Sequence, residues 1–212
     1  MRTAITPETH LRRVDPVMRR LVHEIGPFAL APNVGRSPFE SLARAIAYQQ
    51  LHDRAAESIL RRFMALFPGH RFPKPDAVLA MNSRAIRRAG FSRPKIAALR
   101  DLATKAIDGT VPSGQLIRQL DDEAIIQRLV AVRGIGRWTV EMLLIFQLGR
   151  PDVLPIDDFG VRNGFRMAYG LRTMPTPRAV LQYGERWKPY RTAAAWYLWR
   201  VANREKQAAK VL

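Results

Sequence analysis

Apolar residues recur along this chain at intervals of three and four residues, the spacing that places them on one face of a helix. The clearest stripes lie at residues 17–25, 42–47, 56–67 and 96–106. No stretch alternates convincingly between apolar and polar residues, as a half-buried strand would. The pattern therefore predicts an all-α fold with about ten helices.

Capping residues frame several of these stripes. Asp15 precedes a proline, and Ser37 stands three residues before Glu40, which is the capping-box spacing. Asp53 is predicted to cap the helix that follows it. Further helices are predicted over residues 75–81, 83–89 and 95–107, and others start near residues 121, 177 and 189. Residues 1–14 are predicted to form a loosely attached basic arm.

The stretch from residue 129 to 165 combines a glycine turn with a pair of acids. An apolar helix runs into the turn RGIG at residues 133–136, a second helix follows, and Asp157 and Asp158 open a third. Glycine lets a backbone approach a ligand closely, and a helix start exposes N–H groups that bind anions. The same dipole favours ionised carboxylates at the next helix start. Taken singly, however, the turn is an ordinary connector and an Asp an ordinary cap.

The most informative feature of the composition is its net charge. The 212 residues include 35 Lys+Arg and 18 Asp+Glu, a formal net charge of +17, which indicates a polyanionic partner such as nucleic acid. The alternative is that these cations form solvated helix faces. A hydrophobic content of 47% fits one globular domain or two closely packed subdomains.

The residue types exclude several other functions. With no cysteine in the chain, disulfides, a thiol nucleophile and an iron–sulfur cluster are ruled out. The four histidines are scattered without metal-ligand spacing. No apolar run is long enough to span a bilayer, and the N-terminal residues lack the apolar core of a signal peptide. An intracellular, cytoplasmic location is therefore expected.

Four segments together resemble the helix-hairpin-helix DNA glycosylase superfamily, and within it the 3-methyladenine DNA glycosylase II branch. They are LVAVRGIGRWTVEMLLIF, LPIDDFGVR, AIAYQQLHDRAAESI and RWKPYRTAAAWYLW, and the resemblance covers residues 36–203. It implies two packed helical subdomains with a cleft between them, forming a single domain over residues 1–212. The hairpin motif would lie at about residues 121–147. No counterpart of the small N-terminal sheet domain of some bacterial members is expected.

The resemblance also implies an activity. Family members excise alkylated purines from DNA by hydrolysing the N-glycosidic bond, while the target nucleotide is held outside the duplex. The second acid of the pair, Asp158, matches the catalytic carboxylate, and Asp157 matches a neighbour expected to cap the helix. Trp138 matches an aromatic of the pocket wall, and Trp199 one that stacks near the target base. Met142 stands where some relatives carry a tyrosine, so the shape of the pocket is expected to differ.

The remaining matched residues concern the DNA. Leu51, with Gln50 beside it, matches a side chain that wedges into the gap left by the flipped nucleotide. Gly134 and Gly136 match hairpin glycines whose backbone contacts phosphate, often with a bound structural monovalent cation. The other DNA-binding residues expected in the hairpin are Arg133, Ile135 and Arg137. No cofactor and no catalytic metal are expected.

These residues suit the chemistry of an alkylated purine. Such a base is already cationic, so it leaves without a catalytic acid and stacks well on aromatic rings. An ionised Asp158 would stabilise the positive charge that builds on the sugar. Members that also cut the DNA backbone carry a lysine at the position of Trp138, so this chain is expected to be monofunctional.

The expected partner is double-stranded DNA with alkylated bases, bound by a monomer without any membrane. Two alternatives stay open at this point. One is a glycosylase for oxidised or deaminated bases. The other is a non-catalytic helix-hairpin-helix protein that only binds DNA.

Overall fold

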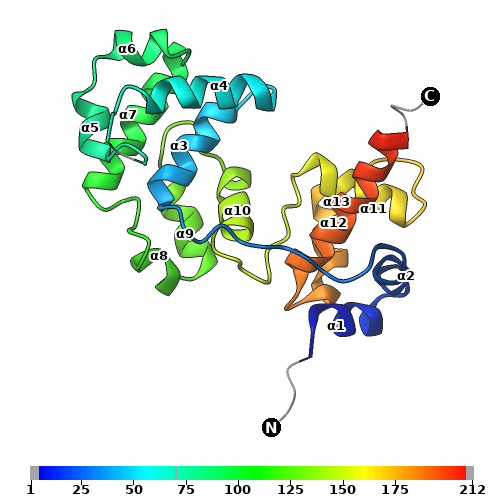
Figure 1. Ribbon diagram of the computed structural model, residues 1–212. Helices are drawn as coiled ribbons and strands as arrows, with labels where there is room; N and C mark the ends of the chain where they lie inside the picture. The colour runs from blue at the N-terminus through cyan, green and yellow to red at the C-terminus, as the bar shows by residue number, and fades with distance from the viewer. Residues whose placement is uncertain (1–4, 70, 209–212) are drawn as a thin grey trace. The chain divides into compact units, whose positions relative to one another are not determined.

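The computed structural model describes residues 5–69 and 71–208, and in them it contains thirteen α-helices, one 3-10 helix and no strand (Figure 1). The prediction of an all-α fold is confirmed. The helices are α1 Pro7–Val14, α2 Pro16–Ile25, α3 Pro38–Tyr48, α4 Asp53–Met64, α5 Pro75–Ala80, α6 Ser83–Arg88, α7 Arg93–Ile107, α8 Leu116–Gln119, α9 Asp122–Leu129, α10 Arg137–Phe146, α11 Phe159–Ala168, α12 Pro177–Gly184, η1 Glu185–Trp187 and α13 Arg191–Ala208.

The chain divides into two compact units. The first joins residues 1–32 to residues 144–212, and the second comprises residues 33–143. The first unit is therefore built from both ends of the chain, and the second is a continuous segment. Helix α10 passes from the second unit into the first near its C-terminal end.

The core of the first unit lies around α13, whose Tyr197 and Leu198 are fully buried together with Trp187 of η1. Helix α11 lies alongside α13 (Figure 1). Gly164 makes this close approach possible, because a Cβ at that position would overlap the backbone carbonyl of Leu198. The absence of a side chain at Gly164 therefore lets α11 lie closer to α13 than any larger residue would allow.

A fully buried carboxylate, Asp15, ties three parts of the first unit together. Its Oδ1 accepts hydrogen bonds from the backbone N–H groups of Val17 and Met18 at the start of α2. Its Oδ2 accepts from the Tyr169 hydroxyl at 2.6 Å and from the Trp187 indole N–H at 2.9 Å. The sequence predicted only the capping role, whereas the structure adds two long-range donors.

The prediction of a loose arm over residues 1–14 is wrong where the structure describes it. Thr6 caps α1, and Leu11 in that helix is fully buried in the core of the first unit. The Glu8 carboxylate accepts a hydrogen bond from the backbone N–H of Phe28 at 3.0 Å. One apolar side chain and one long-range hydrogen bond therefore fix a segment that composition alone describes as basic and polar. Residues 1–4 lie outside the described part.

The second unit is organised on α7, against which α3 and α5 pack. Its core includes a cluster of aromatic rings. The ring centroid of Phe63 lies 5.2 Å from that of Phe67 and 5.1 Å from that of Phe91. The Lys95 ammonium of α7 donates to the Ala47 carbonyl at 2.7 Å, near the C-terminal end of α3. This hydrogen bond fixes the C-terminal end of α3 on α7. It thereby fixes the point at which the loop between α3 and α4 begins.

Local signals placed most helix boundaries within two residues. Ser37 does cap α3 through the Glu40 backbone N–H. Asp53 is the first residue of α4 rather than its cap, and α8 had no counterpart in the sequence pattern. Among the described residues, no helix has the length and apolar character needed to cross a membrane.

Candidate active site

The hairpin lies in the second unit between α9 and α10. Asp121 caps α9 by accepting from the backbone N–H of Ala124, and the chain turns at Gly134, which has a φ of 76°. Glycine adopts this left-handed conformation without the steric penalty of a Cβ. In the described part of the chain the N–H groups of Gly134 and Gly136 have no hydrogen-bond acceptor. Two backbone donors are thus exposed where α10 begins, which suits an anion.

Two side chains hold this turn from outside it. Asp101 of α7 accepts a 2.7 Å hydrogen bond from the backbone N–H of Arg133, and it also binds the Lys105 ammonium. Burial alone would raise the pKa of Asp101, but these donors together keep it below the usual value. On the other side, the amide of Gln49 donates to the Gly134 carbonyl at 2.8 Å.

The loop between α3 and α4 carries the predicted wedge. Gln50 has a φ of 57°, the only positive φ at a non-glycine residue in the described part of the chain. This conformation costs an L-residue about 1–2 kcal/mol, so surrounding contacts must maintain it. The next residue, Leu51, is 39% exposed although it is apolar. The loop therefore holds a strained backbone and presents a leucine to solvent.

The other predicted DNA-binding residues differ in what they offer. The Ile135 side chain is buried, and its N–H donates to the Val132 carbonyl. The Arg137 guanidinium lies 3.0 Å from Glu123 and 3.2 Å from Glu141. A hydrogen bond from Arg137 lowers the pKa of Glu123. Arg133 is exposed. Of the two arginines, Arg137 is held by ion pairs to Glu123 and Glu141, and Arg133 has no such ion pair among the described residues.

The predicted pocket residues of α10 lie along one helix. Trp138 is 48% exposed near its start, and Met142 is half-buried one turn later. About half of the Trp138 side chain is therefore at the surface of the second unit.

Asp158 and Trp199 lie together in the first unit. Oδ1 of Asp158 accepts from the backbone N–H of Val161 and from the indole N–H of Trp199, both at 2.8 Å. Gly160 permits this arrangement, because a Cβ there would lie 2.8 Å from Cδ1 of Trp199. The carboxylate is half-buried and lies at the N-terminal end of α11, where the helix dipole is positive.

The expectation that Asp157 caps this helix is wrong. The N-cap of α11 is Asp158 itself, whereas Asp157 is exposed one residue earlier. Both acids fit the sequence rule for a helix start, and only the path of the backbone decides between them. Asp158 therefore combines a capping role with the position expected of the reactive carboxylate.

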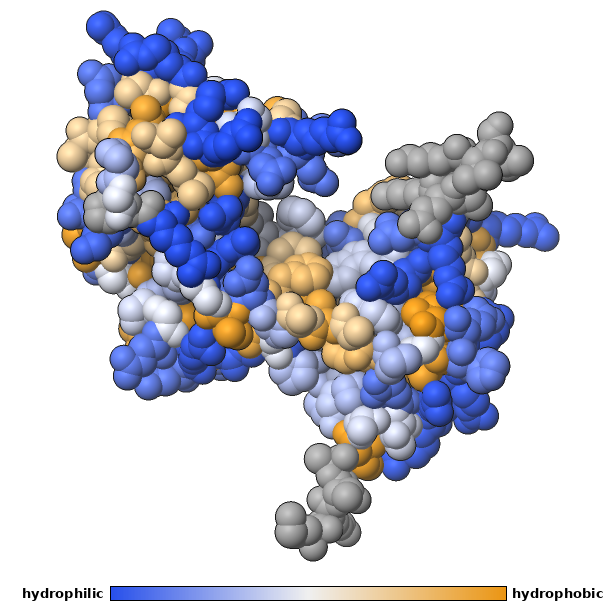
Figure 2. Space-filling view, viewed as in Figure 1, coloured by the Kyte–Doolittle hydropathy of each residue, from blue (hydrophilic) through white to orange (hydrophobic). Residues whose placement is uncertain are grey.

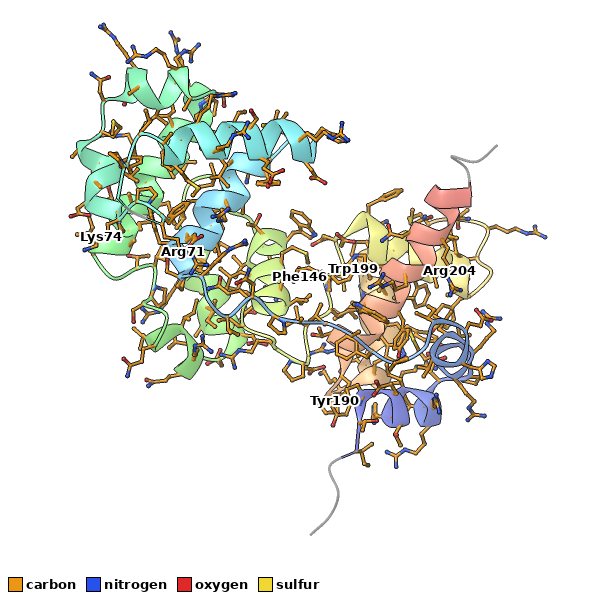
Figure 3. All side chains as sticks on the ribbon, viewed as in Figure 1. Arg71, Lys74, Phe146, Tyr190, Trp199 and Arg204 are labelled. Carbon is orange, nitrogen blue, oxygen red and sulfur yellow. The ribbon has the colours of Figure 1, made fainter. Side chains whose placement is uncertain are left out.

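Sequence reasoning missed Phe146, the last residue of α10. Its ring stacks on that of Trp199, with centroids 5.6 Å apart and planes at 27°, and it is still 42% exposed. Figure 3 shows the two side chains facing each other from α10 and α13. The sequence alone does not distinguish an exposed phenylalanine at a helix end from a core residue. The structure thus places an aromatic platform beside Asp158.

The surface is mainly polar. Figure 2 shows hydrophilic side chains over most of the face in view, with smaller apolar areas between them. Together with the net charge of +17, this surface suits a polyanion.

Comparison with known proteins agrees with this geometry. Residues 43–189 match the family described as HhH-GPD superfamily base excision DNA repair protein. The chain belongs to this family, and the resemblance seen in its sequence is confirmed. DNA-3-methyladenine glycosylase 1 of Schizosaccharomyces pombe is 43% identical over 199 residues, which cover 92% of this chain and 86% of the relative.

Two solved structures are similar over nearly the whole fold. One is the 3-methyladenine DNA glycosylase Mag1 of Schizosaccharomyces pombe in complex with abasic DNA, with a TM-score of 0.80 and 43% identity over 92% of this chain and 95% of that one. The other is a DNA-3-methyladenine glycosidase from Bacillus halodurans, with a TM-score of 0.83 and 31% identity over 95% and 92%.

The family resemblance also implies a monovalent cation at the hairpin. The turn supplies backbone carbonyl oxygens, which are the hard donors that such an ion takes. The Gly134 carbonyl is already an acceptor for Gln49. Among the described residues, no group of three or more His, Asp or Glu side chains could hold a metal ion. A structural cation bound by main-chain oxygens of this turn therefore stays an expectation from the family resemblance.

Proposed function

We propose that this chain is a monofunctional DNA glycosylase that hydrolyses the N-glycosidic bond of alkylated purines of the 3-methyladenine type. The observation that carries the proposal is the carboxylate of Asp158, held by Trp199 and Val161 at the start of α11. The 43% identical relative named as a 3-methyladenine glycosylase supports the substrate class. Base excision repair is the process in which such a reaction belongs.

Asp158 acts on the sugar. As the bond from C1′ to the base nitrogen breaks, its electron pair goes to the cationic base, which leaves neutral, and positive charge builds on the deoxyribose. The ionised carboxylate stabilises that charge and orients the water that adds to C1′. The water then loses its proton to the carboxylate or to solvent. The two donors on Oδ1 fix the orientation of this group before the reaction starts.

Aromatic rings recognise the cationic base. Trp199 and Phe146 form a stacked pair next to Asp158. A cation over an aromatic face gains about 0.5–2 kcal/mol, so a methylated purine is favoured over a normal one. Trp138 and Met142 keep the base-contacting roles proposed from the sequence. Trp138 stands where a lysine would form a Schiff base, so the DNA backbone is not cut.

The second unit binds the DNA. Taking a nucleotide out of the duplex costs about a few kcal/mol, and insertion of Leu51 would offset part of that loss. The N–H groups of Gly134 and Gly136 bind a phosphate, with Arg133 beside them. The proposed partner is double-stranded DNA that contains an alkylated base. The protein acts as a monomer inside the cell.

The decisive test is base release from methylated duplex DNA by wild type, Asp158→Asn and Asp157→Asn. Asparagine still caps a helix and still accepts from Trp199, so Asp158→Asn is expected to fold and bind DNA while losing base release. Asp157→Asn removes the same charge one residue away and is the matched control, with near-wild-type release expected. Near-wild-type release by Asp158→Asn would overturn the catalytic assignment.

The substrate claim is tested with defined lesions. Duplexes that carry 3-methyladenine or 7-methylguanine are expected to lose the base and leave an abasic site that breaks only in alkali. Release of hypoxanthine or 8-oxoguanine without 3-methyladenine would replace this proposal with a glycosylase of the other class. Salt-sensitive binding without any lesion dependence would indicate a protein that only binds DNA.

A further inference from the structure

Gln49 joins the two parts of the second unit that the proposed function assigns to DNA. Its Nε2 donates to the Gly134 carbonyl at 2.8 Å, and these two residues are 85 positions apart in the sequence. Gly134 is the central residue of the phosphate-binding turn, and Gln49 ends α3 immediately before the loop with the wedge. One hydrogen bond thus links the wedge loop to the hairpin.

The two ends of this link are fixed independently of it. Lys95 holds the C-terminal end of α3 through the Ala47 carbonyl, and Asp101 holds the hairpin through the Arg133 N–H. Both side chains come from α7. The hairpin therefore keeps its place on α7 without Gln49. The additional effect of the Gln49 amide is to fix the position of the residues after α3 relative to the turn.

Those residues need such a constraint. Gln50 has the left-handed φ of 57°, and the Leu51 N–H reaches back to the Tyr48 carbonyl at 3.2 Å. A strained residue persists only when its surroundings hold it. On either side of Gln50, Gln49 donates to the Gly134 carbonyl and Leu51 donates to the Tyr48 carbonyl. Release of Gln49 would let Gln50 relax, and a change of φ there would re-aim the exposed Leu51 side chain.

We propose that Gln49 is a positioning residue that sets the direction of the Leu51 wedge relative to the phosphate bound at the hairpin. This inference rests on the proposed function, because it assigns Leu51 to the duplex and Gly134 to a phosphate. Gln49 acts through Leu51 and does not touch the reacting atoms. The hydrogen bond keeps the Leu51 side chain in a fixed position relative to the phosphate-binding turn, so that both can contact the same DNA together.

A double-mutant cycle with Gln49→Met and Leu51→Ala tests this role. Methionine has nearly the shape of glutamine and lacks the donor, and Gln119→Met on the exposed face of α8 is the matched control. One readout is single-turnover release of 3-methyladenine. The other is the fluorescence of 2-aminopurine placed next to an abasic analogue in a duplex, which reports unstacking without any chemistry.

We expect Gln49→Met to lower both readouts about five-fold, roughly the effect of one neutral hydrogen bond. Its thermal midpoint, its affinity for undamaged DNA and the salt dependence of that affinity should match wild type, since Asp101 still anchors the hairpin. In the Leu51→Ala background the same substitution should cause no further loss. By contrast, Asp101→Ala should weaken the binding of undamaged DNA.

Three results with the Gln49→Met variant would overturn the inference. They are unchanged readouts in Gln49→Met, losses that multiply with those of Leu51→Ala, and a weakened affinity for undamaged DNA that accounts for the whole loss. Absence of any fluorescence change with wild-type protein would also overturn it, since no wedge would then enter the duplex. If wild type unstacks the DNA but releases no alkylated base, the proposed reaction fails while the fluorescence cycle still decides the role of Gln49.

Discussion

The indole N–H of Trp199 donates a 2.8 Å hydrogen bond to Oδ1 of Asp158, across 41 positions of the sequence. The same indole stacks on Phe146. Under the proposed function, one side chain would serve both the recognition of a cationic base and the orientation of the carboxylate beside it. The substitution Trp199→Phe can separate the two contributions, because phenylalanine keeps an aromatic ring and lacks the N–H donor.

Trp199→Phe is expected to slow single-turnover base release about ten- to 150-fold, since a hydrogen bond to a charged group contributes about 1.5–3 kcal/mol. Stacking on Phe146 should persist, so affinity for a duplex with an abasic analogue should change little. The measurement is the release rate at saturating enzyme. A rate equal to that of wild type would show that the indole N–H does not orient the carboxylate.

Gly164→Ala is expected to destabilise the first unit by about 1–3 kcal/mol or more, because the new Cβ overlaps the backbone of Leu198. Backbone atoms do not swing away as a flexible side chain does, so α11 would have to move off α13. Urea unfolding measures the loss. Gly35→Ala is the control, since its Cβ would lie 3.8 Å from the nearest atom, Oδ1 of Asn33, and its stability should stay within about 0.5 kcal/mol of wild type.

Asp15→Asn is expected to lower the free energy of unfolding by about 2 kcal/mol or more. Asparagine can still cap α2, but its amide cannot accept from both Tyr169 and Trp187, and the indole N–H is only a donor. Tyr169→Phe, which removes one of the two donors, should cost less. Equal stability of Asp15→Asn and wild type in urea would contradict a structural role for this buried carboxylate.

Alkaline pH is expected to destabilise the fold through buried tyrosines. Burial raises the pKa of Tyr197 to about 12, whereas an unfolded phenol titrates near about 10. The unfolded chain therefore loses its proton first, so the stability is fully present below about pH 10 and is lost as the pH rises towards about 12. Burial, with Asp15 next, also raises the pKa of Tyr169.

The measurement for this effect is the urea midpoint between about pH 8 and pH 11.5. Tyr197→Phe should show a shallower decline than wild type, although it loses the hydrogen bond to the Gly26 carbonyl at neutral pH. Tyr48→Phe, which alters an exposed ring, should decline as wild type does. Identical slopes for wild type and Tyr197→Phe would remove Tyr197 from the explanation.

Local patterns determined the helices and the reactive segments of this protein. The stripes at three and four, the caps Asp15 and Ser37, and the glycine turn before α10 all depend on contacts within a few residues. Such contacts can be read from spacing, because helix geometry places residues three and four apart on one face. The family and its expected carboxylate, Asp158, followed from motifs of the same local kind.

Only the tertiary structure decided how these segments are used. It made Asp158 rather than Asp157 the cap of α11, fixed α1 in the core through Leu11, and placed Phe146 on Trp199. It also set the amide of Gln49 on the Gly134 carbonyl. Spacing along the chain does not encode these pairs, because their partners are brought together by helix packing and by the direction the backbone takes through its turns.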